Sequence, residues 1–213
     1  MEATFHQLNS SLSSLDSPHK YKLLAADGSS FSFFSAPQWD YQVYFVSEGH
    51  SAKGIYSLLL NALYNLDTHT YEDAIIQPVH CKDEYKAFCT MVDRVRQPND
   101  TSCIFIADCG YCSYNNMTHV IEKKQFFLFR TKDVTNRGMA AHLPVPKEGA
   151  FDICLDIVIK RPSQKKSRHT VIMSPLSALQ PLLTFLHMAP GILIHFLSGL
   201  SGSRWKMVLM NVL

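Results

Sequence analysis

The stretch that decides the fold is Cys103-Ile-Phe-Ile-Ala-Asp108-Cys-Gly-Tyr-Cys-Ser-Tyr-Asn-Asn116. A short apolar run bounded by turn residues predicts a buried central strand. The carboxyl end of such a strand lies at the rim of the sheet, where open α/β folds place their chemistry. Asp108 is therefore a candidate functional residue, although an Asp at this point can also do no more than cap the next turn.

A second stretch of the sequence follows the same pattern and strengthens the case for Asp108 as a functional residue. In Tyr21-Lys-Leu-Leu-Ala-Ala-Asp27-Gly-Ser-Ser30 an apolar run again ends in Ala-Asp and is followed by Gly. We expect a first strand over residues 21–34 with a turn near Gly28. Two strands that each bring one Asp to the same sheet edge create a site for hard divalent cations, because like charges at short range need a cation between them. Two-metal phosphoryl-transfer sites hold such ions about 3.5–4 Å apart.

Several motifs together resemble the DDE transposases of bacterial insertion sequences, the IS-four-like group, over roughly residues 20–160. They are Ala26-Asp27-Gly28-Ser29, Leu60-Asn-Ala-Leu-Tyr-Asn-Leu-Asp-Thr-His-Thr-Tyr71, Asp73-Ala-Ile-Ile-Gln77 and Ile106-Ala-Asp108-x-Gly-Tyr-x-Ser-Tyr-Asn-Asn116. The resemblance implies an α/β fold, an RNase H-like mixed sheet with flanking helices. It implies that Asp27 and Asp108 are the first two acidic catalytic residues and metal ligands. It also implies Mg²⁺ as cofactor, insertion-element ends of DNA as partner, and a homodimer in the intact family.

The chain departs from the family pattern in two ways. Cys109 stands where the family usually has Arg, in Asp-Arg-Gly-Tyr. The family's third acid is a Glu within Tyr-x2-Arg-x3-Glu-x6-Lys, and that pattern does not occur in these 213 residues. Glu122 follows Asp108 too closely, while Glu148 and Asp152 fall in an insertion segment. We therefore expect a truncated and inactive transposase fragment, or alternatively a non-catalytic DNA-binding relic.

The periodicity predicts the order of elements. Residues 35–52 read as loop, and residues 55–66 and 70–79 as a hairpin. Residues 82–97 carry a helical stripe. The 103–107 strand leads to a helix over about 114–124, capped by Ser113, and to a strand over 126–130. Residues 151–159 alternate as a half-exposed strand.

Four segments follow from this order. Residues 1–19 are a Ser-rich linker or remnant, with no room for the helical DNA-binding region that precedes the catalytic domain in the family. Residues 20–132 form the incomplete catalytic core, residues 133–169 a partial β insertion, and residues 170–213 an aberrant apolar tail. We expect this tail to be poorly structured, as a frameshift would leave it.

Composition and charge favour a globular chain and argue against a membrane or secreted protein. Hydrophobic residues make up 46% and charged residues 18%, as in ordinary globular chains. All 18 acidic residues lie at or before Asp156, and beyond His169 the only formal charges are Arg204 and Lys206. Pro and His interrupt every candidate membrane span in the tail, so no membrane partner is expected. Six cysteines without a signal-like N-terminus indicate reduced thiols and a cytoplasmic location.

Three further groups of residues are candidates for redox chemistry, zinc binding or DNA binding. Cys109-Gly-Tyr-Cys112 lies between a strand and a helix, the position of a thioredoxin-like redox pair, so a CxxC thiol redox protein is the rival interpretation. A zinc site is less favoured, because Cys81, Cys89 and His80 do not supply paired ligand spacing. The basic residues Lys123, Lys124, Arg130 and Lys132 read as solvated surface, or as phosphate contacts if the chain binds DNA.

Overall fold

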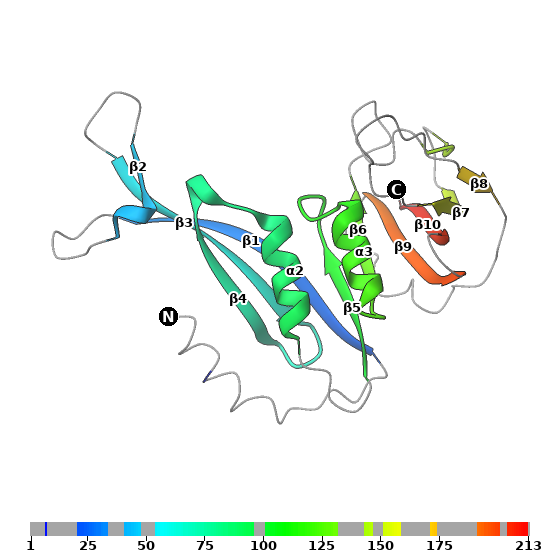
Figure 1. Cartoon of the computed structure of the whole chain (residues 1–213), viewed down its shortest axis with the longest axis horizontal. Helices are drawn as coiled ribbons and strands as arrows, with labels where there is room; N and C mark the ends of the chain where they lie inside the picture. The colour runs from blue at the N-terminus through cyan, green and yellow to red at the C-terminus, as the bar shows by residue number, and fades with distance from the viewer. Residues whose placement is uncertain are drawn as a thin grey trace. The chain divides into compact units, whose positions relative to one another are not determined.

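The computed structural model describes residue 7 and residues 21–33, 41–47, 54–95, 101–131, 143–146, 151–158, 171–173, 191–200 and 204–212. The chain divides into two compact units, Met1–Cys103 and Ile104–Leu213. In the described residues, each unit combines several strands with an α-helix (Figure 1).

The first unit contains an antiparallel sheet and a helix that packs on it. Its elements are β1 (Tyr21–Phe33), the 3-10 turn η1 (Gln42–Tyr44), β2 (Phe45–Ser47), β3 (Gly54–Asn65), β4 (Thr70–Pro78), the 3-10 turn η2 (Val79–Cys81) and α2 (Glu84–Arg94). β3 pairs with β1 along one edge, and with β2 and then β4 along the other. The predicted hairpin over 55–79 is thus confirmed as β3 and β4.

Two local expectations for this unit are wrong. β1 runs without a break from Tyr21 to Phe33, and Gly28 is paired with Asn61 instead of turning. β3 pairs with β1 from Leu24 to Phe33, so the pairing overrides the turn preference of Gly28. The expected loop over 35–52 contains the short strand β2, which pairs with the start of β3.

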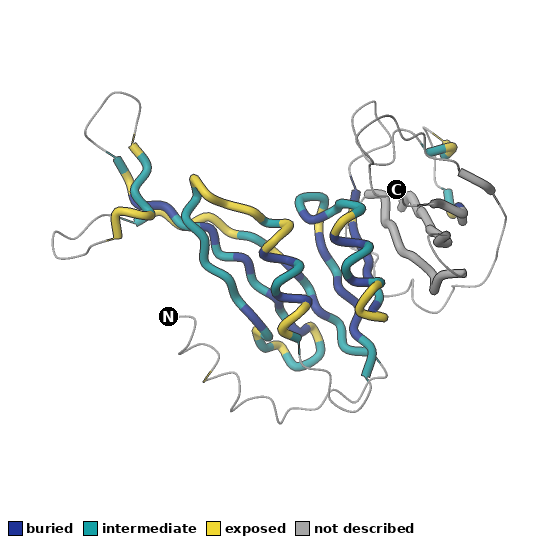
Figure 2. The backbone as a smooth tube through the Cα atoms, in the orientation of Figure 1, coloured by how far each residue is buried: buried dark blue, intermediate teal, exposed yellow. Residues whose placement is uncertain are grey.

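Helix α2 packs on β3 and β4 through the apolar stripe that its sequence predicts. Its buried residues are Ala87, Phe88, Met91 and Val92, and Figure 2 shows buried and exposed residues alternating along the helix. The helix begins where the side chain of Asp83 accepts a hydrogen bond from the Lys86 amide at 2.9 Å. At the other end Arg94 lies 3.7 Å from the buried carboxylate of Asp73 on β4.

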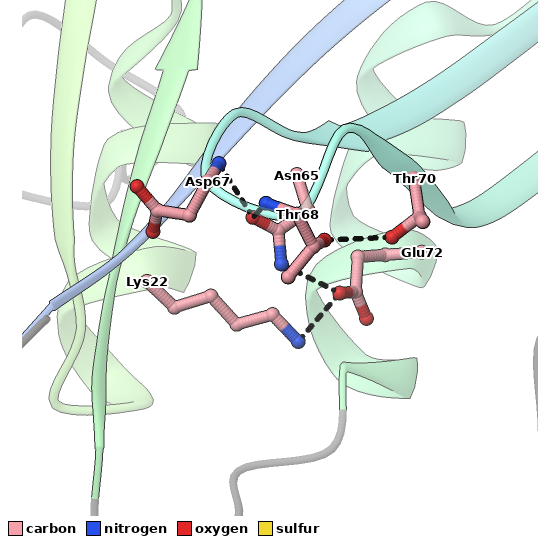
Figure 3. Close-up of polar contacts among 6 residues, drawn as sticks. All are labelled: Lys22, Asn65, Asp67, Thr68, Thr70 and Glu72. Carbon is pink, nitrogen blue, oxygen red and sulfur yellow. Dashed lines mark hydrogen bonds and ion pairs between the residues drawn. The ribbon is translucent and has the colours of Figure 1, made fainter. Parts of the chain in front are cut away.

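The turn between β3 and β4 is organised by a buried side chain, Asn65, which is 2% exposed. Its Oδ1 accepts hydrogen bonds from the amides of Asp67 and Thr68, at 2.9 and 3.2 Å. Its Nδ2 donates to Glu72 at 3.0 Å, and Glu72 pairs with Lys22 of β1 at 2.7 Å (Figure 3). The Asn65 side chain therefore ties the turn to β4, and the Glu72–Lys22 ion pair extends the link to β1.

The second unit begins within β5. Its elements are β5 (Ser102–Ala107), α3 (Tyr114–Glu122), β6 (Phe126–Thr131), β7 (Phe151–Val158), β8 (Val171–Met173), β9 (Gly191–Leu200) and β10 (Arg204–Val212). β5 and β6 are parallel, with Ala107 opposite Phe129, and α3 connects them and packs on β6. β6 is antiparallel to β9. β9 pairs with β10, β10 pairs with β7, and β7 pairs with β8.

The two units together bear out the predicted fold class. Strand, hairpin, helix, strand, helix and strand follow in the order expected of an RNase H-like domain, with parallel and antiparallel pairs in the sheet. The 151–159 strand is confirmed as β7, in which Leu155 is buried and Asp152 is exposed. Within the apolar tail, residues 171–173, 191–200 and 204–212 form strands, and the rest of the tail lies outside the described residues.

Candidate functional site

Asp108 lies directly after β5, at the carboxyl end of the parallel pair, and its side chain is exposed. The strand ends here because the next residues form a tight turn. Asp108 Oδ1 accepts a hydrogen bond from the Gly110 amide at 2.8 Å, and the Asp108 carbonyl accepts one from the Tyr111 amide at 3.2 Å. The side chain thus caps its own turn, as the simple structural interpretation proposes, and still presents a carboxylate to solvent.

A basic residue lies at the same edge of the sheet. In the parallel register Ala107 is opposite Phe129, so Asp108 and Arg130 each directly follow the last paired residues of β5 and β6. Neighbouring strands are about 4.8 Å apart. Arg130 is exposed, so this edge carries an acid and a base that both face solvent.

The other predicted basic residues occupy a different place. Lys123 and Lys124 are exposed just beyond α3, where the Lys123 amide donates to His119 O at 3.3 Å and Lys124 adopts a positive φ of 58°. They precede β6, whereas Arg130 lies near its far end, so the strand separates them by roughly 13 Å. Lys132 lies outside the described residues.

Asp27 occupies the middle of β1, not its end, and this corrects the expectation of two matching strand ends. It is opposite Ala62 of β3 and is exposed. Its Oδ1 accepts a hydrogen bond from the Gly28 amide at 2.8 Å. A mid-strand Asp has its direction fixed by the pleat of the sheet, so Asp27 holds its position without a turn.

The carboxylates are chemically suited to a divalent cation, since Mg²⁺ and Ca²⁺ prefer oxygen ligands. Among the described residues, however, no group of three His, Cys, Asp or Glu side chains is placed to hold a metal. Glu122 is exposed on the last turn of α3, Asp152 is exposed on β7, and Glu148 lies outside the described residues. The described residues therefore do not fit a complete two-metal site.

The cysteines of the CxxC motif flank the Asp108 turn. Cys109 and Cys112 are both half-buried and carry free thiols. Burial raises the pKa of the Cys112 thiol to about 11, and a hydrogen bond with Thr131 offsets only part of this effect. Redox and catalytic cysteines work as thiolates with lowered pKa values, so this environment disfavours that chemistry.

A buried residue at the end of the 103–116 stretch, which was not among the predicted site residues, supports the same turn. Asn116, in the first turn of α3, is fully buried, and its Nδ2 donates to the Tyr111 carbonyl at 2.9 Å. Ser113 caps the helix as predicted, accepting from the Asn116 amide at 3.2 Å. One sequence signal could have identified Asn116. It is an Asn three residues after the helix cap, a position that Glu or Gln more often occupies.

Comparison with known proteins agrees with this arrangement. Residues 18–183 match the family described as "Transposase DDE domain", which is more than half of the chain. No curated protein matches the chain. In the part of the chain that the structure describes, no helix is long and apolar enough to span a bilayer. On the strength of the family match, the chain belongs to the DDE transposase family.

Proposed function

We propose that Asp27 and Asp108 are two of the carboxylates with which this DDE transposase domain binds Mg²⁺, and that these 213 residues alone do not complete DNA strand transfer. Transposases of this family act on DNA and generally use divalent metal ions. The observation that carries the proposal is the exposed Asp108 carboxylate at the carboxyl end of β5, held by the Gly110 amide. In open α/β sheets this is the edge where ligands bind.

The role of each residue follows from the charge that develops during strand transfer. A bound divalent cation would activate water or a 3′-hydroxyl group and stabilise the leaving oxygen. Asp27 and Asp108 would supply negative oxygen ligands for it. Arg130, at the same edge as Asp108, is suited to a backbone phosphate of the DNA, because a guanidinium group pairs with two phosphate oxygens at once.

The proposed loss of activity rests on the number of acidic ligands. A two-metal site needs carboxylates on both ions, and the chain lacks the family's Tyr-x2-Arg-x3-Glu-x6-Lys pattern. Cys109 also replaces the basic residue usual beside Asp108. Two carboxylates can still hold a cation weakly, so metal binding and catalysis are separable here.

Membership of the IS-four-like group and dimer formation remain predictions.

Titration with Mn²⁺, followed by electron paramagnetic resonance, tests the metal proposal. Either Asp27→Asn or Asp108→Asn should weaken Mn²⁺ binding at least about tenfold, because each removes a charged ligand. Asp93→Asn, an exposed acid on α2, is the matched control and should leave the affinity unchanged. Equal affinities for the wild-type chain and both ligand variants would exclude these residues as metal ligands.

A further inference from the structure

We draw no further inference here: the strongest candidate, the apolar sheet face of the first unit on which Phe31, Leu58, Leu60 and Ile76 lie, carries none because nothing in the described part of the structure shows what covers it.

Discussion

At the scale of single residues, the surroundings of a side chain decide which of two motif interpretations its chemistry allows. Asp108 and Cys112 lie four residues apart, and both belong to motifs that can carry catalysis. Asp108 is exposed, with one oxygen held by a backbone amide, which suits a metal ligand. Cys112 is half-buried, and burial raises its pKa to about 11, which favours the neutral thiol. The same loop thus supports carboxylate chemistry and opposes thiolate chemistry.

This contrast predicts slow alkylation of Cys112. A pKa near 11 instead of 9.0 lowers the thiolate fraction at pH 8 by about a hundredfold, because each pH unit below the pKa reduces it tenfold. Iodoacetamide should therefore modify Cys112 far more slowly than the exposed Cys81, and the difference should shrink as the pH rises towards 11. Mass spectrometry of timed digests measures both sites in one sample. Faster reaction at Cys112 than at Cys81 at neutral pH would restore the CxxC redox interpretation.

At the scale of elements, the sequence predicted what local pattern controls. The apolar stripe of α2, the Ser113 cap of α3 and the hairpin of β3 and β4 all follow from short-range spacing and were found as expected. The sequence did not predict the behaviour of Gly28, which prefers turns but is held in β1 by pairing with β3. Strand register depends on contacts between distant residues, and a single sequence does not reveal these directly.

The candidate site also combines features that local sequence predicts with features that depend on tertiary contacts. The Asp-x-Gly turn at residues 108–110 is a local signal and was visible in the sequence. The link from Asn116 to Tyr111 depends on how a helix folds back over the preceding turn, so it became visible only in the structure. Asn65 is a similar case, because its bonds to Glu72 and to the amides of the turn join residues that no periodic pattern connects.

Asn65 gives a prediction for the hairpin. Asn65→Ala removes a buried donor and a buried acceptor, leaving the amides of Asp67 and Thr68 without their side-chain partner. Loss of such buried hydrogen bonds costs about 2 kcal/mol of unfolding free energy. Urea denaturation of Asn65→Ala beside Asn115→Ala, an exposed Asn, measures the difference. Equal unfolding midpoints for the two variants would show that the Asn65 network does not stabilise the hairpin.

At the scale of the whole molecule, binding to DNA and chemistry on DNA have different requirements. Binding needs exposed positive charge, which Lys123, Lys124 and Arg130 supply in the second unit. Chemistry needs a complete set of metal ligands. The described residues contain no group of three His, Cys, Asp or Glu side chains placed to hold a metal ion. We therefore predict that the chain binds duplex DNA without sequence preference and does not cleave or join it.

The salt dependence of binding tests the first half of this prediction. Replacing Lys123, Lys124 and Arg130 by Ala should lower the slope of log affinity against log salt by up to about 3, since each lost phosphate contact removes nearly one unit. The control variant Lys82→Ala/Lys86→Ala removes exposed positive charge from the first unit and should change the slope little. Fluorescence anisotropy with a labelled duplex gives both slopes. If the control variant lowers the slope as much as the triple variant does, the contacts are not where we place them.

The second half is tested by incubating the chain with DNA from both flanks of its gene and a target plasmid, in Mg²⁺ and then in Mn²⁺. We expect neither nicked nor joined products, because the two proposed carboxylate ligands would be too few for a site that serves both the attacking and the leaving oxygen. Mn²⁺ is the stricter test of the predicted inactivity, because it binds such sites more tightly than Mg²⁺ does. Products that vanish with Asp108→Asn would show that another group completes the site. That group would then be sought among the acids outside the described residues, beginning with Glu148.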